Sequence, residues 1–396
     1  MNFTIKINKN NAILPSILFA LMFDIQALAF GLMVLTHRSF LTIGYVVLIV
    51  LTVLCLLLNR TLHITKETCF VAIVLVIYYV IANGKSGVEP IYFGAWVILP
   101  VLLSCLKFNT EYVLRYTAVF VIPLLLLNNQ MFAGTSTFSM GTTYNFFPAV
   151  LAATVHFMFY RKEVSKWMYI AYIGNIYYFY QVLLHGSRGP VLAVILYFIF
   201  VYFCRYNDEE NRIKIDFPKF LVATIGMFVI YFNYLNIFSW IAERLRNRNV
   251  NFNFIDKVLR LAANGDVTNG RNDILSVALK EWIDRPIFGH GMSTFNYYTG
   301  IDYPHNFILQ LLFDGGIVLF IIVVGLMIRK IVTVVKHATR HNFVFFVFLF
   351  FVSVPTALLS QDLFENFRFW MFEFTLLNNV FTVRNPEVEY FRDLKE

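Results

Sequence analysis

Residues 342–360 read NFVFFVFLFFVSVPTALLS, nineteen residues without a charged side chain. An α-helix needs about 20 mostly apolar residues to cross the hydrocarbon core of a bilayer, so this stretch predicts a membrane-spanning helix. Similar runs recur along the chain and predict about twelve spans. Their approximate limits are 12–34, 41–58, 68–83, 91–106, 112–128, 145–160, 167–184, 190–204, 217–237, 305–328, 342–360 and 367–383. Several runs are close to the lower limit of length, which leaves open that a pair of them is re-entrant.

The composition agrees with a polytopic membrane protein. Of the 396 residues, 59% are hydrophobic and only 14% are charged, whereas soluble domains average about 45–50% apolar and about 25% charged residues. The same composition excludes a disordered chain, a coiled coil and a disulfide-rich secreted scaffold. The four cysteines lie inside apolar runs, where they are typical of small hydrophobic side chains without metal-binding spacing. They are Cys55, Cys69, Cys105 and Cys204.

The basic residues predict how the spans are oriented. Short cytoplasmic loops of membrane proteins retain Lys and Arg, and an N-terminus inside the cell places 19 of the 32 basic residues in inner segments. The short outer loops then carry only Arg38, Lys85, Arg188 and Arg368. This alternation predicts an all-α protein with an even number of spans and both termini in the cytoplasm. The formal net charge of +8 is therefore an orientation signal, and nucleic acid is not an expected partner.

The N-terminus allows a second interpretation. Lys6 and Lys9 precede an apolar run that ends in Ala27-Leu28-Ala29, a pattern that also fits a signal peptide and its cleavage site. The next loop is external in either case, so the rest of the predicted topology is the same.

One outer loop is far longer than the others. The topology divides the chain into residues 1–236 with nine spans, an outer loop of residues 237–304, and residues 305–396 with three spans and a cytoplasmic tail. The loop has eight Lys and Arg against seven Asp and Glu, so it is not a generic basic patch. Its periodicity predicts two or three short helices. The clearest is 272–284, which Asn272 caps and Pro286 stops.

A first polar cluster, His185-Gly186-Ser187-Arg188-Gly189-Pro190, opens the eighth span at the outer surface. Ser caps helices, Pro suits the first turn, and Gly lets a backbone approach a ligand. Ser187, Arg188 and Gly189 therefore predict a helix N-terminus that binds phosphate beside a guanidinium. The simpler alternative is an interfacial cap with a snorkelling Arg188.

Two further clusters carry an arginine and a histidine. Arg271 follows Gly270 at a helix start in the outer loop and would supply a second guanidinium to bind an anion. A solvated helix start is the alternative. His305 and Asn306 open the tenth span, where the positive potential of a helix N-terminus favours the neutral imidazole that a general base requires. Asn306 would orient this base or the acceptor, although a histidine that merely caps the helix remains an alternative.

Other polar residues are secondary candidates. His290, in the turn Gly289-His290-Gly291, competes for the role of base, but a glycine turn predicts flexibility and favours His305. Arg244 and Arg248 near the start of the outer loop are candidate contacts to an acceptor. Glu365 and Arg368 are expected to form a surface ion pair. The carboxylates predicted inside spans are functional candidates by default, unless Asp24 and Glu373 are solvated near a span end. These carboxylates are Asp24, Asp314 and Glu373.

At these residues the chain resembles the bacterial O-antigen polymerase and O-antigen ligase superfamily of membrane glycosyltransferases. The resemblance covers roughly residues 185–325, and no Asp-x-Asp, His-Glu-x-x-His or phosphate-binding loop motif accompanies it. The motifs are Ser187-Arg188-Gly189, Gly270-Arg271, Trp282, Asp284-Arg285-Pro286-Ile287-Phe288-Gly289-His290-Gly291, His305-Asn306-Phe307-Ile308-Leu309-Gln310 and Gly315-Gly316.

The resemblance implies a GT-C-like enzyme of the bacterial inner membrane that transfers a glycan from undecaprenyl diphosphate on the periplasmic face, without a metal or other cofactor. By position, Arg188 and Arg271 match the arginines expected to bind the diphosphate. His305 matches the histidine expected to activate the acceptor hydroxyl. The implied partners are the lipid-linked oligosaccharide, the bilayer, a chain-length regulator and a flippase.

Three functions remain open at this point. The Ser-Arg-Gly form of the first motif and Phe307, where ligases of the superfamily often have an acidic residue, favour a polymerase of lipid-linked repeat units. The alternative is a ligase that moves the finished polymer to lipid A-core. A flippase is disfavoured, because internal repeats and uniformly short loops would be expected of a transporter.

Overall fold

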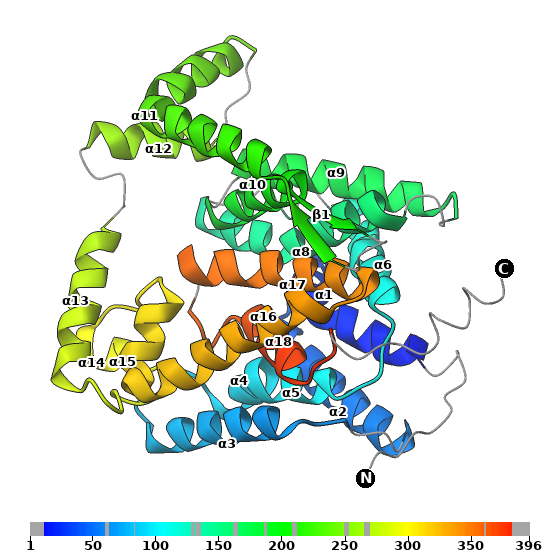
Figure 1. Cartoon of the computed structure of the whole chain (residues 1–396), viewed down its shortest axis with the longest axis vertical. Coiled ribbons are helices and arrows are strands. Elements are labelled where there is room, and N and C mark those ends of the chain that lie inside the picture. The colour runs from blue at the N-terminus through cyan, green and yellow to red at the C-terminus, as the bar shows by residue number, and fades with distance from the viewer. Residues whose placement is uncertain are drawn as a thin grey trace.

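The computed structural model describes residues 12–59, 63–82, 84–127, 131, 136–160, 165–185, 188–207, 212–248, 253–264, 270–359 and 362–381, and Figure 1 shows the chain as a bundle of helices. The first half contains α1 (Ile13–Thr36), α2 (Leu41–Asn59), α3 (Lys66–Ile81), α4 (Pro90–Phe93), the π-helix η2 (Gly94–Ile98), α5 (Leu99–Ser104), α6 (Thr110–Phe120), the 3-10 helix η3 (Ile122–Leu127), α8 (Ser136–Tyr160) and α9 (Met168–His185). The second half contains α10 (Arg188–Phe203), the strands β1 (Cys204–Asn207) and β2 (Arg212–Ile215), α11 (Phe217–Arg246), α12 (Asn253–Ala263), α13 (Arg271–Asp284), α14 (Phe295–Thr299), α15 (Phe307–Phe320), the π-helix η4 (Ile321–Gly325), α16 (Leu326–His337), α17 (Arg340–Leu359) and α18 (Phe367–Leu377).

Five helical stretches in the described part of the chain are long and apolar enough to cross a membrane. They are Ile13–Thr36, Leu41–Leu58, Thr110–Leu127, Phe307–His337 and Arg340–Leu359. A polytopic membrane protein is therefore supported, whereas the number of twelve spans and the position of both termini stay predictions.

The expected all-α architecture is confirmed for the described residues apart from one short hairpin, which was not predicted. β1 and β2 form an antiparallel hairpin between α10 and α11, with Arg205 opposite Lys214. This hairpin lies in a loop that was predicted only as a basic cytoplasmic connection. Charge patterning reports the side of a loop and not its backbone conformation, which explains why the hairpin was missed.

The first part of the predicted outer loop is helical. α11 continues without a break to Arg246, past the expected boundary at residue 237, and an ion pair from Arg246 to Asp256 (2.6 Å) ties it to α12. Three short helices, α12, α13 and α14, then follow within the residues described. α13 starts at Arg271, directly after Gly270, which adopts φ 75°. Asn272 lies inside the helix, so the expected cap by Asn272 is wrong.

The last helix is much shorter than its predicted span. α18 has 11 residues, a length of about 16 Å, which is roughly half of the hydrocarbon core. Asn366 caps its beginning by accepting from the amide of Phe369, and Asn379, with φ 59°, follows its end. Polar residues therefore end this helix on both sides. Because the helix is only about half as long as a full span, it favours the alternative that this segment is re-entrant.

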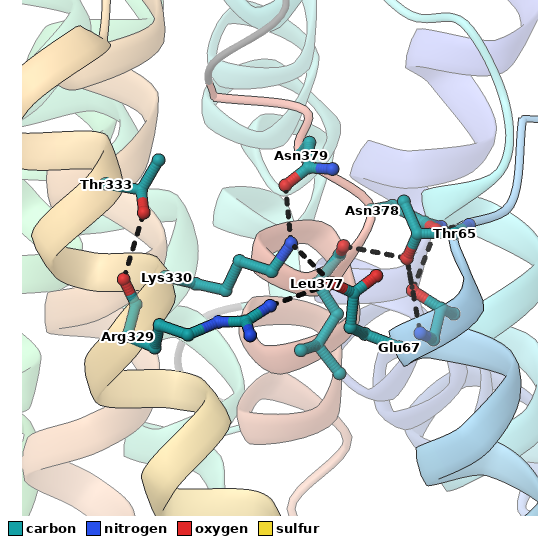
Figure 2. Close-up of polar contacts among 9 residues, drawn as sticks. Thr65, Glu67, Arg329, Lys330, Thr333, Leu377, Asn378 and Asn379 are labelled. Carbon is teal, nitrogen blue, oxygen red and sulfur yellow. Dashed lines mark hydrogen bonds and ion pairs between the residues drawn. The ribbon is translucent and has the colours of Figure 1, made fainter.

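Polar contacts anchor the end of α18 to three other helices, and Figure 2 shows those near α3 and α16. Oδ1 of Asn378 accepts from Oγ1 of Thr68 (2.7 Å) at the start of α3, and its Nδ2 donates to Oγ of Ser104 (2.7 Å) at the end of α5. Nζ of Lys330 in α16 donates to Oδ1 of Asn379 (2.7 Å) and lies 3.6 Å from Glu67. Lys330 was predicted only as an inner-loop charge, but here it is buried and holds the end of α18 in place.

The core surrounds α17 and α18, whose Phe and Trp side chains are buried. In the most apolar 18-residue stretch of α17, 83% of the residues are buried, whereas the corresponding share in α2 is only 22%. α17 is thus an interior helix and α2 a peripheral one. An aromatic interior of this kind holds α18, and with it the segment just before α18, at a fixed position beside α15.

Candidate functional site

The long helix α15 is interrupted by a glycine. Gly316 adopts φ 62° and ψ −166°, a conformation that in practice only glycine tolerates. The interruption would leave carbonyl and amide groups of the helix without partners. The outer segment supplies them: the amides of His290 and Gly291 donate to the carbonyls of Phe313 (2.9 Å) and Asp314 (2.8 Å).

On the other side of the break, the hydrogen bonds run in the opposite direction. The amides of Ile317 and Val318 donate to the carbonyls of Pro286 (2.8 Å) and Ile287 (3.2 Å). A Cβ on Gly316 would collide with the backbone of Ile287, and a Cβ on Gly289 would collide with that of Phe313 and Asp314. The turn at 285–291, termed the docked turn below, is therefore built into the broken helix.

His290 belongs to this docked turn and is not flexible, contrary to the prediction. Its ring stacks on Phe313 with centroids 4.6 Å apart, and its Nε2 lies 2.9 Å from the carbonyl of Glu281. A carbonyl only accepts, so Nε2 carries the proton of this contact. The side chain is buried. Packing and this hydrogen bond together give His290 a structural role.

His305 and Asn306 stand at the start of α15. Asn306, not His305, caps the helix: its Oδ1 accepts from the amides of Ile308 (3.0 Å) and Leu309 (3.3 Å). Its Oδ1 is thus engaged with the helix, and the orienting role of Asn306 stays a prediction that would depend on its Nδ2. His305 adopts φ 57°, and its half-buried ring lies against Tyr303 with centroids 4.2 Å apart.

Tyr303 marks the point at which three segments meet. The pKa of its phenol is raised to about 12, mainly by burial. The carboxyls of Asp362 and Glu365 contribute to this rise, and the guanidinium of Arg271 opposes it. These charges act on the phenol because they lie close to it. Arg271 at the start of α13 and Glu365 before α18 are thus within electrostatic range of Tyr303, and His305 before α15 is in direct ring contact with it.

The segment before α18 is fixed to α15 by Gln310. Its Nε2 donates to Oδ2 of Asp362 (2.9 Å) and its Oε1 accepts from the amide of Leu363 (2.7 Å). Burial raises the pKa of the Asp362 carboxyl. Glu365 lies at the surface, and partial burial, together with the carboxyls of Asp362 and Asp302, raises its pKa to about 7. A titratable group with this pKa changes charge near neutral pH.

Arg368 does not form the predicted surface ion pair. Only 2% of its surface is exposed, and its Nη2 donates to the carbonyl of Tyr144 (3.0 Å) and to Oε1 of Gln26 (3.5 Å). No ion pair between Glu365 and Arg368 is present among the described residues. α18 is buried on all sides, so a residue in its first turn faces the interior. Tyr144 in turn contributes to the raised pKa of Tyr303.

The three carboxylates predicted inside spans are all fully buried, and solvation near a span end is excluded for Asp24 and Glu373. Sequence reasoning gave no role to Tyr303 and Asp362, which it named only as members of polar clusters, or to Gln310, which it quoted only within a motif, and it did not single out Tyr144. Gln310 gave a usable signal, because a glutamine inside an apolar run of a span needs a hydrogen-bond partner. Nothing in the sequence indicated that this partner would be Asp362, 52 residues away.

The structure describes no contact between this group and the remaining predicted site residues, some of which lie outside the described part of the chain. Ser187 lies outside the described residues, and Arg188 begins α10 with a side chain that is also outside the described part; Gly189 is buried. Arg244 and Arg248 are exposed at the end of α11, where Arg244 lies 5.6 Å from the ring of Trp240. Figure 1 shows α11 and α12 at the top of the view, apart from α13 and α15. Within the described residues, no group of three or more His, Cys, Asp or Glu has an arrangement that could hold a metal ion.

Residues 173–324 match the family model described as O-Antigen ligase. The matched segment runs from α9 to η4 and contains Arg188, Arg271, His305 and the broken part of α15. This match supports the O-antigen ligase and polymerase superfamily, whose members are glycosyltransferase-like enzymes of O-antigen biosynthesis, and does not distinguish the two activities. The comparisons with curated proteins and with solved structures gave no match.

Proposed function

We propose that this protein is a periplasmic-face polymerase of the bacterial inner membrane that joins undecaprenyl-diphosphate-linked oligosaccharide repeat units into O-antigen or a related surface polysaccharide. One observation carries the proposal: His305 is in ring contact with Tyr303 and Arg271 is within electrostatic range of the same phenol, and all three lie inside the segment that matches the family model. Such a transfer requires an arginine that binds the diphosphate and an imidazole that takes the proton of the acceptor hydroxyl.

In the proposed reaction, the acceptor hydroxyl oxygen attacks the anomeric carbon of the donor sugar. The bond from that carbon to the diphosphate breaks, and its electron pair stays on the diphosphate oxygen. Arg271 and Arg188 would stabilise the leaving diphosphate; a well-placed charge-stabilising donor contributes about 3–4 kcal/mol. His305 would take the proton of the attacking hydroxyl, a contribution of about 10²–10⁴-fold. A single displacement inverts the anomeric carbon.

Tyr303 and Glu365 have supporting parts in this proposal. With a pKa of about 12, Tyr303 keeps its proton at neutral pH, so its hydroxyl remains a hydrogen-bond donor while its ring holds the ring of His305. Glu365 is close enough to Tyr303 to change the local charge as it ionises near pH 7. An ionised Glu365 would disfavour an anion beside Arg271.

The choice of polymerase over ligase rests on the Ser187-Arg188-Gly189 motif and on Phe307. Phe307 occupies the position where ligases of the superfamily often have an acidic residue, and here it is buried against Phe369 with ring centroids 5.1 Å apart. It therefore offers no polar group to an acceptor. Transfer of the finished polymer to lipid A-core is the second candidate activity.

Purified protein in liposomes with lipid-linked repeat units, in the presence of EDTA, tests the proposal. The expected result is a ladder of products from two repeats upward, absent for Arg271→Ala and His305→Ala and retained for Lys280→Ala, an exposed position of α13. Glycolipid that stays at one repeat would contradict the polymerase. Transfer to added lipid A-core without a ladder would establish the ligase instead.

A further inference from the structure

The docked turn and the end of α13 expose large apolar side chains. Ile283, Ile287 and Phe288 are 67%, 56% and 68% exposed. Soluble surfaces carry such residues singly, whereas neighbouring ones mark a contact surface. These three residues, termed the apolar corner below, follow one another at the end of α13 and on the docked turn. Their exposure needs an explanation that the proposed reaction does not supply.

The position of the docked turn identifies what the apolar corner contacts. On one side, Pro286 and Ile287 accept hydrogen bonds from Ile317 and Val318 of α15. α15 belongs to the candidate span Phe307–His337, and this span exposes Ile317 and, in η4, Ile321. Apolar side chains exposed on a membrane span face lipid. The apolar corner is therefore joined directly to a surface that faces lipid.

A second apolar helix borders the same turn. A Cβ on Gly291 would lie 3.1 Å from Cα of Ala82, directly after α3, and the amide of Met292 lies 3.5 Å from the carbonyl of Tyr78. The end of α3 exposes Val80 and Ile81. The docked turn is thus held between the ends of two helices that both present apolar side chains outward.

We propose that the apolar corner inserts into the outer leaflet of the bilayer, so that the outer segment is in part an interfacial membrane-binding element. The flanking residues agree with this: Lys280, Asp284 and Arg285 are exposed around the corner, as charged side chains at headgroup level would be. Because the corner is continuous with the lipid-facing surface of α15, the bilayer reaches it without any further partner.

This contact fixes the height of α13 above the membrane. α13 has 14 residues, a length of about 21 Å, and carries Arg271 at its start and Ile283 near its end. Lipid contact at the end, together with the docked turn, limits how far the start can move from the bilayer surface. The inference is independent of the proposed reaction, since it concerns only where this helix lies.

Tryptophan quenching tests the insertion. Phe288→Trp and Ile283→Trp place a fluorophore in the corner by changes from one large apolar residue to another, and Asn272→Trp places it at the exposed start of α13 as a matched control. Each full-length variant is reconstituted in nanodiscs of phosphatidylcholine with or without brominated acyl chains, and the emission of the parent protein is subtracted. Acrylamide reports exposure to water in parallel samples.

Brominated lipid is expected to remove most of the added emission of Trp at 288 and 283 and to leave that of Trp at 272 unchanged, while acrylamide shows the reverse order. Quenching of the corner positions by acrylamide alone would place the corner in water and overturn the proposal. Quenching by neither agent would mean that protein covers the corner, either a second copy or a partner, and would overturn it equally.

Discussion

The amide of Ile317 donates to the carbonyl of Pro286 at 2.8 Å, so a residue of the outer segment supplies a hydrogen bond that the broken helix α15 cannot supply itself. The outer segment and the span are consequently one structural unit. This connection holds the docked turn against residues 313–318 of α15, the same helix whose start follows Tyr303 and His305. The broken helix therefore determines the geometry of the candidate site.

Gly316→Ala is expected to destabilise the protein severely, by about 3 kcal/mol or more, because φ 62° and ψ −166° exclude a side chain and a Cβ collides with Ile287. Gly325→Ala is the matched control: Gly325 has helical dihedrals, and its nearest neighbour would be 3.9 Å from the new Cβ. Thermal unfolding in detergent should show a large loss for the first variant only. Equal melting temperatures for both would contradict the role of the break.

The length of the apolar runs predicted the helical membrane fold, because a helix in lipid requires an apolar residue at almost every position. It did not predict the break in α15: Gly315-Gly316 was quoted only as part of a motif, and its hydrogen bonds come from a turn some 30 residues earlier in the chain. Likewise, α18 was predicted as a full span, since the apolar residues after Leu377 extend the run although Asn378 and Asn379 end the helix.

The candidate site was predicted one residue at a time and not as a group. Arg271 and His305 were identified from the chemistry that arginine and histidine offer at helix starts. Tyr303 was named beside His305 but given no role, because an aromatic residue before a span is ordinarily an interfacial anchor. Arg368 was assigned to the surface because hydropathy does not reveal which side of a short helix faces the interior.

Arg368→Gln distinguishes a buried arginine from a surface one. Loss of the two charge-assisted hydrogen bonds to Tyr144 and Gln26 should lower the free energy of unfolding by about 3–6 kcal/mol, given about 1.5–3 kcal/mol for each. Arg38→Gln, at an exposed position, should change it by no more than about 0.5 kcal/mol. Chemical denaturation in detergent measures both. A loss of stability at Arg368 as small as that at Arg38 would contradict the buried position of Arg368 and favour the surface position first predicted.

His290→Phe separates the two candidate bases. Phenylalanine keeps the stacking on Phe313 but leaves the carbonyl of Glu281 without its donor, a cost of about 1–3 kcal/mol. Polymer synthesis by the folded variant should nevertheless stay close to that of the wild type, whereas His305→Ala should lower the rate by about 10²–10⁴-fold. Initial rates of ladder formation decide the matter, and the opposite order would make His290 the base.

Glu365→Gln should remove a pH dependence of stability. The folded protein holds the proton of Glu365 up to about pH 7, compared with an ordinary pKa of 4.5, so it binds more protons than the unfolded chain between these values. Wild-type stability therefore falls as pH rises through this window, and the loss is complete above about pH 7. The melting temperature of the variant should equal that of the wild type near pH 4.5 and exceed it near pH 8. Parallel curves would show that burial does not perturb this carboxyl.

Arg271→Lys tests whether the guanidinium itself is needed. A guanidinium binds a diphosphate through two parallel hydrogen bonds, which the single ammonium group of lysine does not reproduce. We expect Arg271→Ala to lower the rate of polymer synthesis by about 10²–10³-fold and Arg271→Lys to recover only a small part of that loss. Lys280→Ala, on the exposed side of the same helix, should leave the rate unchanged. Full recovery by lysine would show that only the positive charge at position 271 is needed. Full activity of Arg271→Ala would show that Arg271 does not belong to the site.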